Sequence, residues 1–508
     1  MWQEEVVNDL FEAGVKDDKL ALLYEINKTN KVAVNTPDGL SERKSVENII
    51  CQGDPWGSLE CSLQVDSIGK DSLKAELEPY KYKSEVEIPA LGVVDDLLTV
   101  SESGYKAARM NSYINAKTAI KKLQFGPKKC HVLHVGKNHE DYQKVAHYVE
   151  NWKMSEMQSI HAGGENYEES YDGEHIMSAE AAEKYLGQVI SNDSTNTKNI
   201  EALRNKGIGL QNKIVQILNT ISAGKYHFEV AIILRNSYLI SSILTSSEVW
   251  YSVTIAEMSR LEQVDEMLWL NILECSGNVP RELIYLELGI LRIRDIIKIR
   301  RLMFLHHIMH QPKDSLVYKF FLAQARSPTH RDWTSQVLED LEEIKLEVNF
   351  NDTGDISKER FKNVVSKHVK EHAYTELIER KKARVSEHAR GKLIAYKDLD
   401  MQEYLMETDI DISLDEKKWI FKCRTDDIDL KANFQWKHEN IWCISCKKDF
   451  PETNEHLLQC KALLEANEIV SYIPEYKELF SDELQEIVYT SRVLRENFKK
   501  RKTYMEVK

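Results

Sequence analysis

The stretch LGVVDDLLTV, residues 91–100, places two adjacent carboxylates between two short apolar runs that contain β-branched residues. This pattern predicts a strand, a tight turn and a second strand, with Asp95 and Asp96 at the tip of the hairpin. An acid pair held at such a tip suits Mg²⁺, because this ion favours carboxylate oxygens and fills its other positions with water and phosphate. The stretch therefore predicts a β-hairpin that carries a candidate magnesium site.

Two other Asp-Asp pairs, Asp17-Asp18 and Asp426-Asp427, show that the dipeptide alone is not specific. Both lie in charged surroundings typical of a helix or a loop, where a solvated surface is the simpler interpretation. Of the three pairs, the one in residues 91–100 has apolar strands on both sides, so it alone is a candidate site.

The composition favours a large, mainly helical protein. A chain of 508 residues can form several domains, and its 20 glycines and 10 prolines are few enough to leave long helices uninterrupted. The net charge of −14 argues against a uniform coating by nucleic acid, although a local basic face remains compatible with it. Eight cysteines in a chain of this length, without a signal peptide, do not indicate a disulfide framework.

Targeting signals are sparse. The N-terminal residues lack the apolar core of a secretion signal, and Arg235 and Asn236 interrupt the longest apolar stretch, residues 230–244. We therefore expect no membrane span and an intracellular protein, in the cytoplasm, the nucleus or both. The basic run KKRK, residues 499–502, is either a nuclear address or without function.

Further stretches flank the acid pair in a definite order. Upstream lies a loop with Gln52 and Gly53, where glycine allows a ligand to approach the backbone, although an ordinary turn is the simpler interpretation. Downstream lie FGPKKC, residues 125–130, before a predicted strand, and EKYLG, residues 183–187. In this order the features resemble the palm of a reverse transcriptase, most closely that of the non-LTR (LINE-type) retrotransposons.

The resemblance extends over nearly the whole chain and implies an α+β fold. This fold would be a partial polymerase palm with an antiparallel sheet, followed by a mainly α-helical thumb and C-terminal region with a small zinc knuckle. The polar linker Asn192–Asn196 would end the palm. We expect these segments: palm 1–190, thumb-like domain 191–335, helical C-terminal region 336–430, CCHC zinc-knuckle segment 431–470 and helical basic tail 471–508.

The resemblance also implies roles for individual residues. Asp95 and Asp96 would hold the catalytic Mg²⁺ or Mn²⁺, and Lys129 would approach the triphosphate and act as a general acid. The template, the incoming nucleotide and the primer end would be contacted by Gln52, Gly53, Tyr185, Leu186 and Gly187. The implied reaction transfers nucleotides from dNTPs to a DNA primer on an RNA template, with two metal ions at the reacting oxygens.

The chain departs from the family pattern in two respects. Val93 stands where the family usually has an aromatic residue. The third catalytic Asp and the basic fingers of the family lie upstream of the first helices seen here, and residues 1–50 place no Asp on a plausible central strand. The resemblance therefore predicts an N-terminally truncated, C-terminal part of a polymerase, which we expect to be inactive alone.

A basic segment follows the predicted palm. Residues 292–331 contain nine Lys or Arg and two Asp or Glu, and the helical pattern of residues 291–309 places Arg294, Lys298 and Arg301 on one side. One interpretation is a thumb face that contacts the phosphates of a template–primer duplex. The other is a helix face whose charges are neutralised by partners elsewhere in the chain.

The second constellation consists of Cys443, Cys446, His456 and Cys460, with the spacing C-x2-C-x9-H-x3-C. Two thiolates on a tight knuckle, and a His and a Cys one helical turn apart, can meet at a tetrahedral Zn²⁺. Four protein ligands would close the shell, so the zinc would be structural. The alternative is a set of small buried hydrophobic side chains. LINE-type polymerases have a similar segment near the C-terminus.

Aromatic and basic residues lie beside the cysteines. The residues that could stack on and neutralise single-stranded nucleic acid are Trp436, Lys437, Trp442, Lys447 and Lys448. The alternative is that the tryptophans support a small core. Three functions are therefore open: a reverse transcriptase, a non-catalytic nucleic-acid-binding remnant with a structural zinc site, and a helical scaffold in which the acids and cysteines are incidental.

Overall fold

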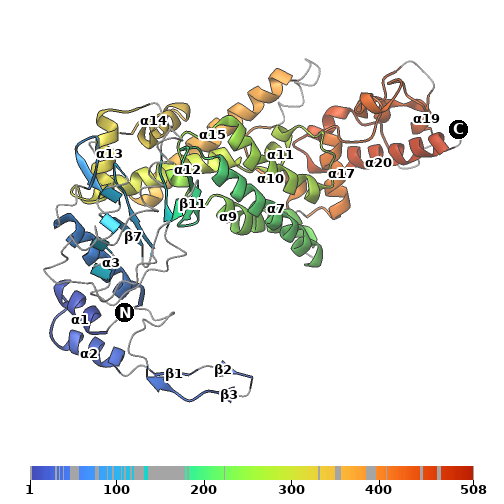
Figure 1. Ribbon diagram of the computed structural model, residues 1–508. Coiled ribbons are helices and arrows are strands. Elements are labelled where there is room, and N and C mark those ends of the chain that lie inside the picture. Colours follow the sequence, from blue (N-terminus) through green and yellow to red (C-terminus); the bar gives the residue numbers. More distant parts are fainter. Residues whose placement is uncertain are drawn as a thin grey trace. The chain divides into compact units, whose positions relative to one another are not determined.

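The computed structural model describes most of the chain. The described residues are 3–28, 31–33, 35–37, 39–45, 57–74, 79–88, 90–93, 96–103, 106–107, 110–111, 113–114, 117–118, 131–135, 178–179, 182–221, 224–329, 332–348, 356–384, 396–407, 409–446, 450–465 and 471–506. The chain divides into two compact units (Figure 1). Unit 1 comprises Met1–Asn199 and Pro312–Ser327, and unit 2 comprises Ile200–Gln311 and Pro328–Lys508.

Unit 1 begins with two helices, α1 (Gln3–Glu12) and α2 (Asp17–Lys28). The chain between them passes through Gly14, whose φ of 96° lies in the region that favours glycine, and this residue separates the two helices. Asp17 and Asp18 occupy the first turn of α2, where the helix dipole stabilises negative charge. This position accounts for the first of the two other acid pairs without a metal ion.

The strands of unit 1 form two-stranded sheets (Figure 1). The antiparallel pairs are β1 (Lys31–Val32) with β4 (Lys44–Ser45), β2 (Asn35–Thr36) with β3 (Gly39–Leu40), β5 (Tyr80–Tyr82) with β6 (Val86–Ile88), β7 (Ala90–Val93) with β8 (Asp96–Thr99), and β11 (Ala182–Tyr185) with β12 (Gln188–Ser191). One pair, β9 (His131–Val132) with β10 (Ser178–Ala179), is parallel. Helices mixed with small antiparallel sheets were predicted and are confirmed, while the palm itself stays a prediction.

Helix α3 (Gly57–Lys74) packs against strand β7. A side chain at Gly92 of this strand would place its Cβ 2.3 Å from Cγ1 of Val65 in α3. This distance is far inside van der Waals contact, so the close approach of helix and strand requires glycine at this position.

Helix α13 (Leu316–Arg326) belongs to unit 1 although it follows the first half of unit 2 in the sequence. Tyr82 of β5 stacks on Phe320 of α13 with their ring centroids 4.3 Å apart. Arg326 and Glu85 form an exposed ion pair of 2.9 Å. The segment predicted as the thumb, residues 191–335, thus contributes one helix to the unit that contains the predicted palm.

Unit 2 is helical in its described parts. Its α-helices are α7 (Thr197–Thr220, whose first residues belong to unit 1), α8 (His227–Leu234), α9 (Ser241–Ile243), α10 (Ile255–Leu273), α11 (Arg281–Leu288), α12 (Ile293–Met309), α14 (Trp333–Glu343), α15 (Lys358–Arg384), α17 (Leu414–Arg424), α18 (Asn454–Gln459), α19 (Lys461–Leu464) and α20 (Leu484–Glu506). Short 3₁₀-helices are η3 (Gly224–Tyr226), η5 (Ser247–Val249), η7 (Glu403–Leu405), η8 (Gln435–Lys437) and η9 (Tyr476–Phe480), and η4 (Arg235–Ile240) is a π-helix. None of the described helices combines the length and the apolar character that crossing a membrane requires.

The main core of unit 2 lies around α10. This helix begins with a capping box, in which Thr254 Oγ1 accepts a hydrogen bond from Glu257 N at 3.2 Å and the Glu257 carboxylate accepts one from Thr254 N at 2.9 Å. Leu268 and Trp269 of α10 and Ile284 of α11 are fully buried. The helix start that these residues predict is therefore the observed one.

Helix α11 ends at Gly289, which has a φ of 62°. A Cβ at this position would lie 2.1 Å from the backbone nitrogen of Met401, and Leu288 forms an antiparallel bridge with Met401. Both the left-handed backbone and the contact with the later segment require glycine here.

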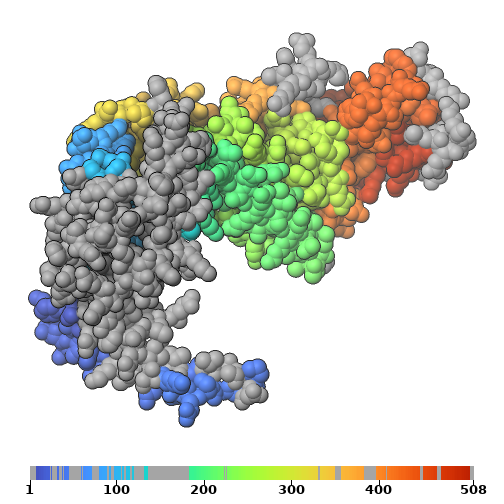
Figure 2. Space-filling view, viewed as in Figure 1, coloured from blue at the N-terminus to red at the C-terminus, as the bar shows by residue number. Residues whose placement is uncertain are grey.

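A second core of unit 2 joins α17, α18, α19 and α20, which form part of the orange and red surface in Figure 2. Leu457, Leu463 and Val493 are fully buried in it. The segment predicted as a zinc knuckle, 431–470, and the segment predicted as a helical tail, 471–508, therefore share one core.

Candidate functional site

The hairpin predicted for residues 91–100 is confirmed. β7 pairs with β8 in a register that runs from Ala90↔Thr99 to Val93↔Asp96, so Val94 and Asp95 connect the strands. Asp96 is the first residue of β8, and its side chain is exposed. Asp95 lies outside the described residues, so the acid pair stays a predicted metal site.

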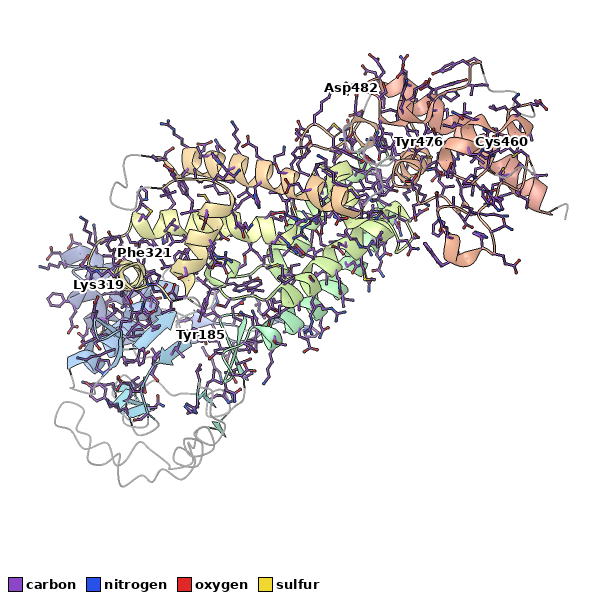
Figure 3. All side chains as sticks on the ribbon, turned by 90° about the horizontal axis from the view of Figure 1, so that it is seen from above. Tyr185, Lys319, Phe321, Cys460, Tyr476 and Asp482 are labelled. Atoms are coloured by element: carbon purple, nitrogen blue, oxygen red, sulfur yellow. The ribbon has the colours of Figure 1, made fainter. Side chains whose placement is uncertain are left out.

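Tyr185 ends the first strand of a second hairpin (Figure 3). Leu186 and Gly187 form its turn, with φ values of 47° and 83°, and Tyr185 pairs with Gln188. Positive φ at both central positions defines a type I′ turn, whose twist matches that of the strands. The turn requires a residue such as Gly187 whether or not a ligand is bound.

The structure brings Tyr185 and Asp96 into electrostatic reach within unit 1. Partial burial, and second the negative charge of Asp96, raise the pKa of the Tyr185 hydroxyl. The charge of the predicted metal ligand therefore acts on the predicted primer contact. Gln52, Gly53 and Lys129 lie outside the described residues, and their roles stay predictions.

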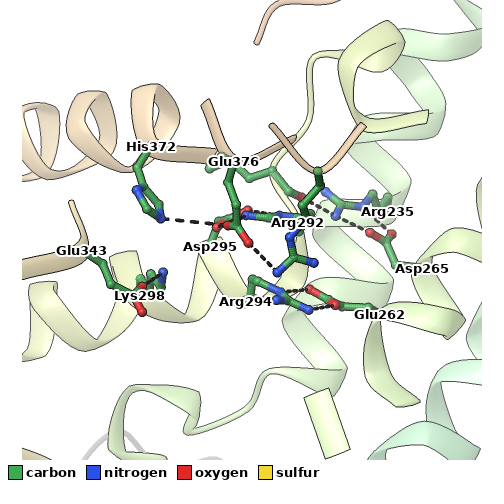
Figure 4. Close-up of polar contacts among 12 residues, drawn as sticks. Arg235, Glu262, Asp265, Arg292, Arg294, Asp295, Lys298, Glu343, His372 and Glu376 are labelled. Carbon is green, nitrogen blue, oxygen red and sulfur yellow. Dashed lines mark hydrogen bonds and ion pairs between the residues drawn. The ribbon is translucent and has the colours of Figure 1, made fainter. Parts of the chain in front are cut away.

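Two of the three predicted phosphate contacts in α12 are paired with carboxylates of the same unit (Figure 4). Arg294 donates two hydrogen bonds, of 2.7 and 2.5 Å, to the Glu262 carboxylate of α10. Lys298 pairs with Glu343 of α14. Carboxylates of the same chain thus neutralise both cations, which agrees with the second interpretation of the basic segment.

The third residue, Arg301, is buried. Its guanidinium donates to the Asp340 carboxylate of α14 and, at 3.1 Å, to the backbone oxygen of Trp250. Arg301 therefore lies in the interior of unit 2 and not on an open basic face. The partners of all three cations come from helices distant in sequence, which is why charge counting within residues 292–331 missed them.

Two further cations of unit 2 are buried in ion pairs that the sequence analysis did not single out (Figure 4). Arg235 of η4 and Asp265 of α10 form two hydrogen bonds of 2.6 Å, and their side chains are 2% and 0% exposed. Arg292 pairs with Asp295 and Glu376. An arginine inside the longest apolar stretch of the chain was the available signal, because a buried charge needs a partner.

The structure brings Cys443, Cys446, His456 and Cys460 together. Their ligand atoms all lie within 4.8 Å of one another. Cys443 Sγ is 4.0 Å from Cys460 Sγ, and Cys446 Sγ is 3.5 Å from His456 Nε2. Tetrahedral bonds of about 2.3 Å to sulfur and about 2.0 Å to nitrogen require separations of about 3.8 and 3.5 Å. The four side chains therefore form a candidate metal centre with a closed shell.

A tight loop positions the first two cysteines. Trp442 pairs with Pro451 in an antiparallel bridge, and Cys443 N donates to Phe450 O at 2.9 Å. These contacts return the chain on itself and place Cys443 and Cys446 at the turn. The backbone thus places both sulfurs on the same loop.

Helix α18 positions the other two ligands. Thr453 caps this helix by accepting a hydrogen bond from His456 N at 3.1 Å, and Cys460 follows the last helical residue. His456 and Cys460 are therefore one turn apart on the same side of the helix. The Phe450 ring stacks on the His456 ring with centroids 5.4 Å apart, which fixes the imidazole.

The thiol of Cys443 is prepared to ionise. Its pKa is lowered, mainly by a hydrogen bond from the Cys460 thiol and further by hydrogen bonds from His456 and from the backbone of Cys446, against the opposing effect of burial. The thiolate is the form that binds metal. The same hydrogen bond raises the pKa of the Cys460 thiol, so Cys460 keeps the shared proton and a metal ion would have to displace it. The cluster therefore has the separations that a metal ion requires and one thiol that ionises readily.

A buried ion pair fastens the loop to the C-terminal helix. Glu452 is fully buried and accepts hydrogen bonds from Arg501 of α20 at 2.7 Å and from Lys431 N at 3.1 Å. Asn497 of α20 donates to Leu457 O of α18 at 2.9 Å. Arg501 belongs to the basic run 499–502, so one residue of that run is buried in the core and is not part of a basic surface.

These residues define a candidate metal centre of the structural Cys₃His type. No protein-family model matches the chain, and no curated protein sequence matches it. Its function must therefore be inferred from its own residues and their geometry.

Proposed function

We propose that the chain derives from a LINE-type RNA-directed DNA polymerase and that unit 1 keeps the metal-binding and primer-binding hairpins. The observation that carries this proposal is the presence of two hairpins in unit 1, β7–β8 with Asp96 at the start of its second strand and β11–β12 with Tyr185 beside its turn. The effect of the Asp96 charge on the Tyr185 hydroxyl agrees with it. A polymerase needs these hairpins as neighbours, because the metal must activate the 3′-oxygen of the bound primer. A helical scaffold has no such requirement.

In this proposal Asp95 and Asp96 hold Mg²⁺ or Mn²⁺, since these hard cations prefer carboxylate oxygens. The ions would supply charge stabilisation for the transferred phosphate. The ligands are an RNA template, a DNA primer and dNTPs, and Tyr185 helps to position the primer end. Two carboxylates are fewer than the family uses, so we expect the chain alone to bind template–primer without extending it.

A nucleic-acid-binding remnant without chemistry is the second candidate. In the part of the chain that the structure describes, the one group of three or more metal-binding side chains is the Cys₃His cluster. A site with four protein ligands has no open position for a substrate. The cluster itself therefore has a structural role, which a remnant that only binds nucleic acid would keep.

We further propose that the ion of the Cys₃His cluster is Zn²⁺. Three sulfurs and an imidazole in tetrahedral arrangement are the donor set that zinc prefers, whereas magnesium and calcium prefer oxygen. The ion would tie the loop of Cys443 and Cys446 to helix α18 through His456 and Cys460. Its role would be to stabilise the C-terminal core.

A primer-extension assay tests binding and chemistry separately. The purified chain is incubated with a labelled DNA primer on an RNA template, dNTPs, and either Mg²⁺ or Mn²⁺. We expect duplex binding that weakens as salt rises, because phosphate contacts release counterions, and no extended primer. The matched variants are Asp95→Asn with Asp96→Asn, and the control pair Asp17→Asn with Asp18→Asn.

The outcomes separate the candidates. Extension that is abolished by the first pair of substitutions and kept by the control pair would establish an active polymerase and overturn the expected inactivity. Salt-dependent binding without extension would support the remnant. Binding that does not depend on salt, or no binding, would favour the scaffold.

A further inference from the structure

A cavity of about 230 Å³ lies in unit 2 and is formed by residues outside the Cys₃His cluster. Its aromatic wall consists of Phe434, Trp436 and Phe480, and its carboxylates are Asp426 and Asp427. Pockets for drug-sized ligands have volumes of about 300–1,000 Å³. The cavity is therefore sized for a single ring system and not for a whole nucleotide.

The floor of the cavity is rigid and electrically balanced. Arg424 lines it, is buried, and donates to the Glu287 carboxylate at 2.8 Å. The same carboxylate accepts hydrogen bonds from the hydroxyls of Tyr396 and Tyr404. The guanidinium lies 4.7 Å from the centroid of the Phe480 ring. The Glu287 carboxylate thus already neutralises Arg424, so this arginine is not a candidate for binding a phosphate.

Asp427 supplies hydrogen-bond acceptors in a fixed orientation. Its carboxylate accepts one hydrogen bond from Ser276 N, at 2.8 Å, and one from the Ser276 hydroxyl. An ionised carboxylate can accept about four hydrogen bonds in total. Asp427 can therefore accept further N–H donors from a ligand while Ser276 holds it in place.

Trp436 supplies a stacking surface. Its side chain is 65% exposed, whereas Phe434 next to it is buried, with the two ring centroids 5.3 Å apart. The exposed Lys437 lies 4.4 Å from the centroid of the Phe434 ring, so a cation is present at the same edge. An aromatic ring with a nearby cation is the combination that proteins use to hold an unpaired base and its phosphate.

We propose that this cavity binds an unpaired nucleobase that stacks on Trp436 and donates hydrogen bonds to Asp427. Guanine fits best, because its pairing edge carries two adjacent N–H donors for one carboxylate. A cationic peptide side chain fits less well, since Arg424 and Lys381 already line the cavity. This inference rests on the proposed nucleic-acid binding and specifies its ligand as a single-stranded segment.

Fluorescence anisotropy with labelled twelve-nucleotide RNAs tests the proposal on the full chain. The RNAs are oligo-uridine, unchanged or with one central G, A or C. We expect the G-containing RNA to bind about 5–50-fold tighter than oligo-uridine. Trp436→Ala weakens binding of every RNA by about 5–100-fold, and Asp427→Asn removes the preference for G. The controls Tyr238→Ala and Asp429→Asn change exposed residues of unit 2 outside the cavity and leave every affinity unchanged.

The outcomes distinguish the cavity from nucleic-acid binding in general. Equal affinities for the four RNAs, with no effect of Trp436→Ala, would overturn the cavity proposal and leave the function proposed above intact. If no RNA binds, calorimetry with guanosine decides: binding lost in both cavity variants would support the cavity and contradict that function, and no binding would overturn both. Displacement of the RNA by arginine amide but not by guanosine would assign the cavity to a cationic peptide and overturn the proposal. Thermal unfolding of each variant shows whether it is folded.

Discussion

The acid pair of unit 1 and the Cys₃His cluster of unit 2 are built in opposite ways. Asp96 is exposed on a hairpin of two four-residue strands. Cys443 and Cys460 are buried in a core, and the buried pair of Glu452 and Arg501 holds the surrounding loop. A metal that acts on a substrate needs open positions, whereas a metal that stabilises a fold needs a complete protein shell. The exposed acid and the buried cluster therefore differ in burial in the way that their proposed roles require.

One ion pair from each unit, Arg326–Glu85 and Arg424–Glu287, differs from the other in the same way. The side chains of Arg326 and Glu85 in unit 1 are 66% and 51% exposed. Those of Arg424 and Glu287 in unit 2 are 1% and 0% exposed. Breaking a buried pair leaves a charge without solvent, whereas water replaces a lost surface partner. We therefore expect substitutions in unit 2 to have the larger effects.

The largest effect is expected at the metal centre. Replacing Cys443 and Cys446 by Ser should reduce zinc from one ion per chain to none and unfold the loop, because zinc contributes about 10–16 kcal/mol to the folding of small zinc peptides. Elemental analysis measures the zinc, and limited proteolysis detects the opened loop. Cys275→Ser, a half-buried thiol outside the cluster, is the control. Unchanged zinc content in the double variant would contradict the assignment.

The next effect is expected at Arg424. Arg424→Ala should lower the free energy of unfolding by about 3–5 kcal/mol, because it leaves the buried Glu287 charge with neutral donors. Denaturant titration measures this loss. The double substitution Arg424→Met with Glu287→Gln removes both charges and should recover part of it. A loss under about 1 kcal/mol for Arg424→Ala would show that water reaches the pair.

A pH effect is expected at Glu376. Partial burial opposes its ionisation, but the hydrogen bond and charge of Arg292 lower its pKa to about 2. Because this pKa lies below the ordinary value of 4.5, the stabilisation is complete above about pH 4.5 and is lost as the pH falls toward 2. Glu376→Gln should remove this part of the pH dependence of the free energy of unfolding, which amounts to at most about 3 kcal/mol.

Thermal unfolding between pH 2 and pH 6 measures the effect of Glu376→Gln. Glu371→Gln changes an exposed acid of the same helix and should leave the profile as it is in the unchanged chain. Parallel profiles for the unchanged chain and Glu376→Gln would refute the role of Arg292.

The smallest effect is expected at the surface pair of unit 1. Arg326→Ala should cost at most about 1 kcal/mol, and less at high salt, because solvent and ions screen exposed charges. Denaturant titration at low and high salt measures it, with the exposed Lys319 of the same helix (Figure 3) replaced by Ala as the control. A loss near that of Arg424→Ala would remove the contrast between the units.

Local patterns predicted the features that lie within one stretch of chain. The alternation around Asp95 and Asp96 predicted the β7–β8 hairpin, and the spacing of the cysteines predicted the Cys₃His cluster. Each depends on geometry within a few residues, which the sequence states directly.

Features assembled from distant segments were not predictable. The carboxylate partners of the α12 cations come from α10 and α14. Helix α13 packs in unit 1, although the residues that precede it in the sequence, 200–311, belong to unit 2. The walls of the cavity come from several segments between Asn278 and Phe480. No local pattern encodes which of many surface charges or aromatic rings will meet, because packing decides it.

Glu287 also has a consequence for the local unfolding of unit 2. Three donors from separate segments, Tyr396, Tyr404 and Arg424, converge on its carboxylate. If α11, residues 396–405 or α17 moved away alone, a buried charge would lose donors that water could not at once replace. We therefore expect the amide hydrogens of these three segments to exchange with solvent at a common rate, as one cooperative unit.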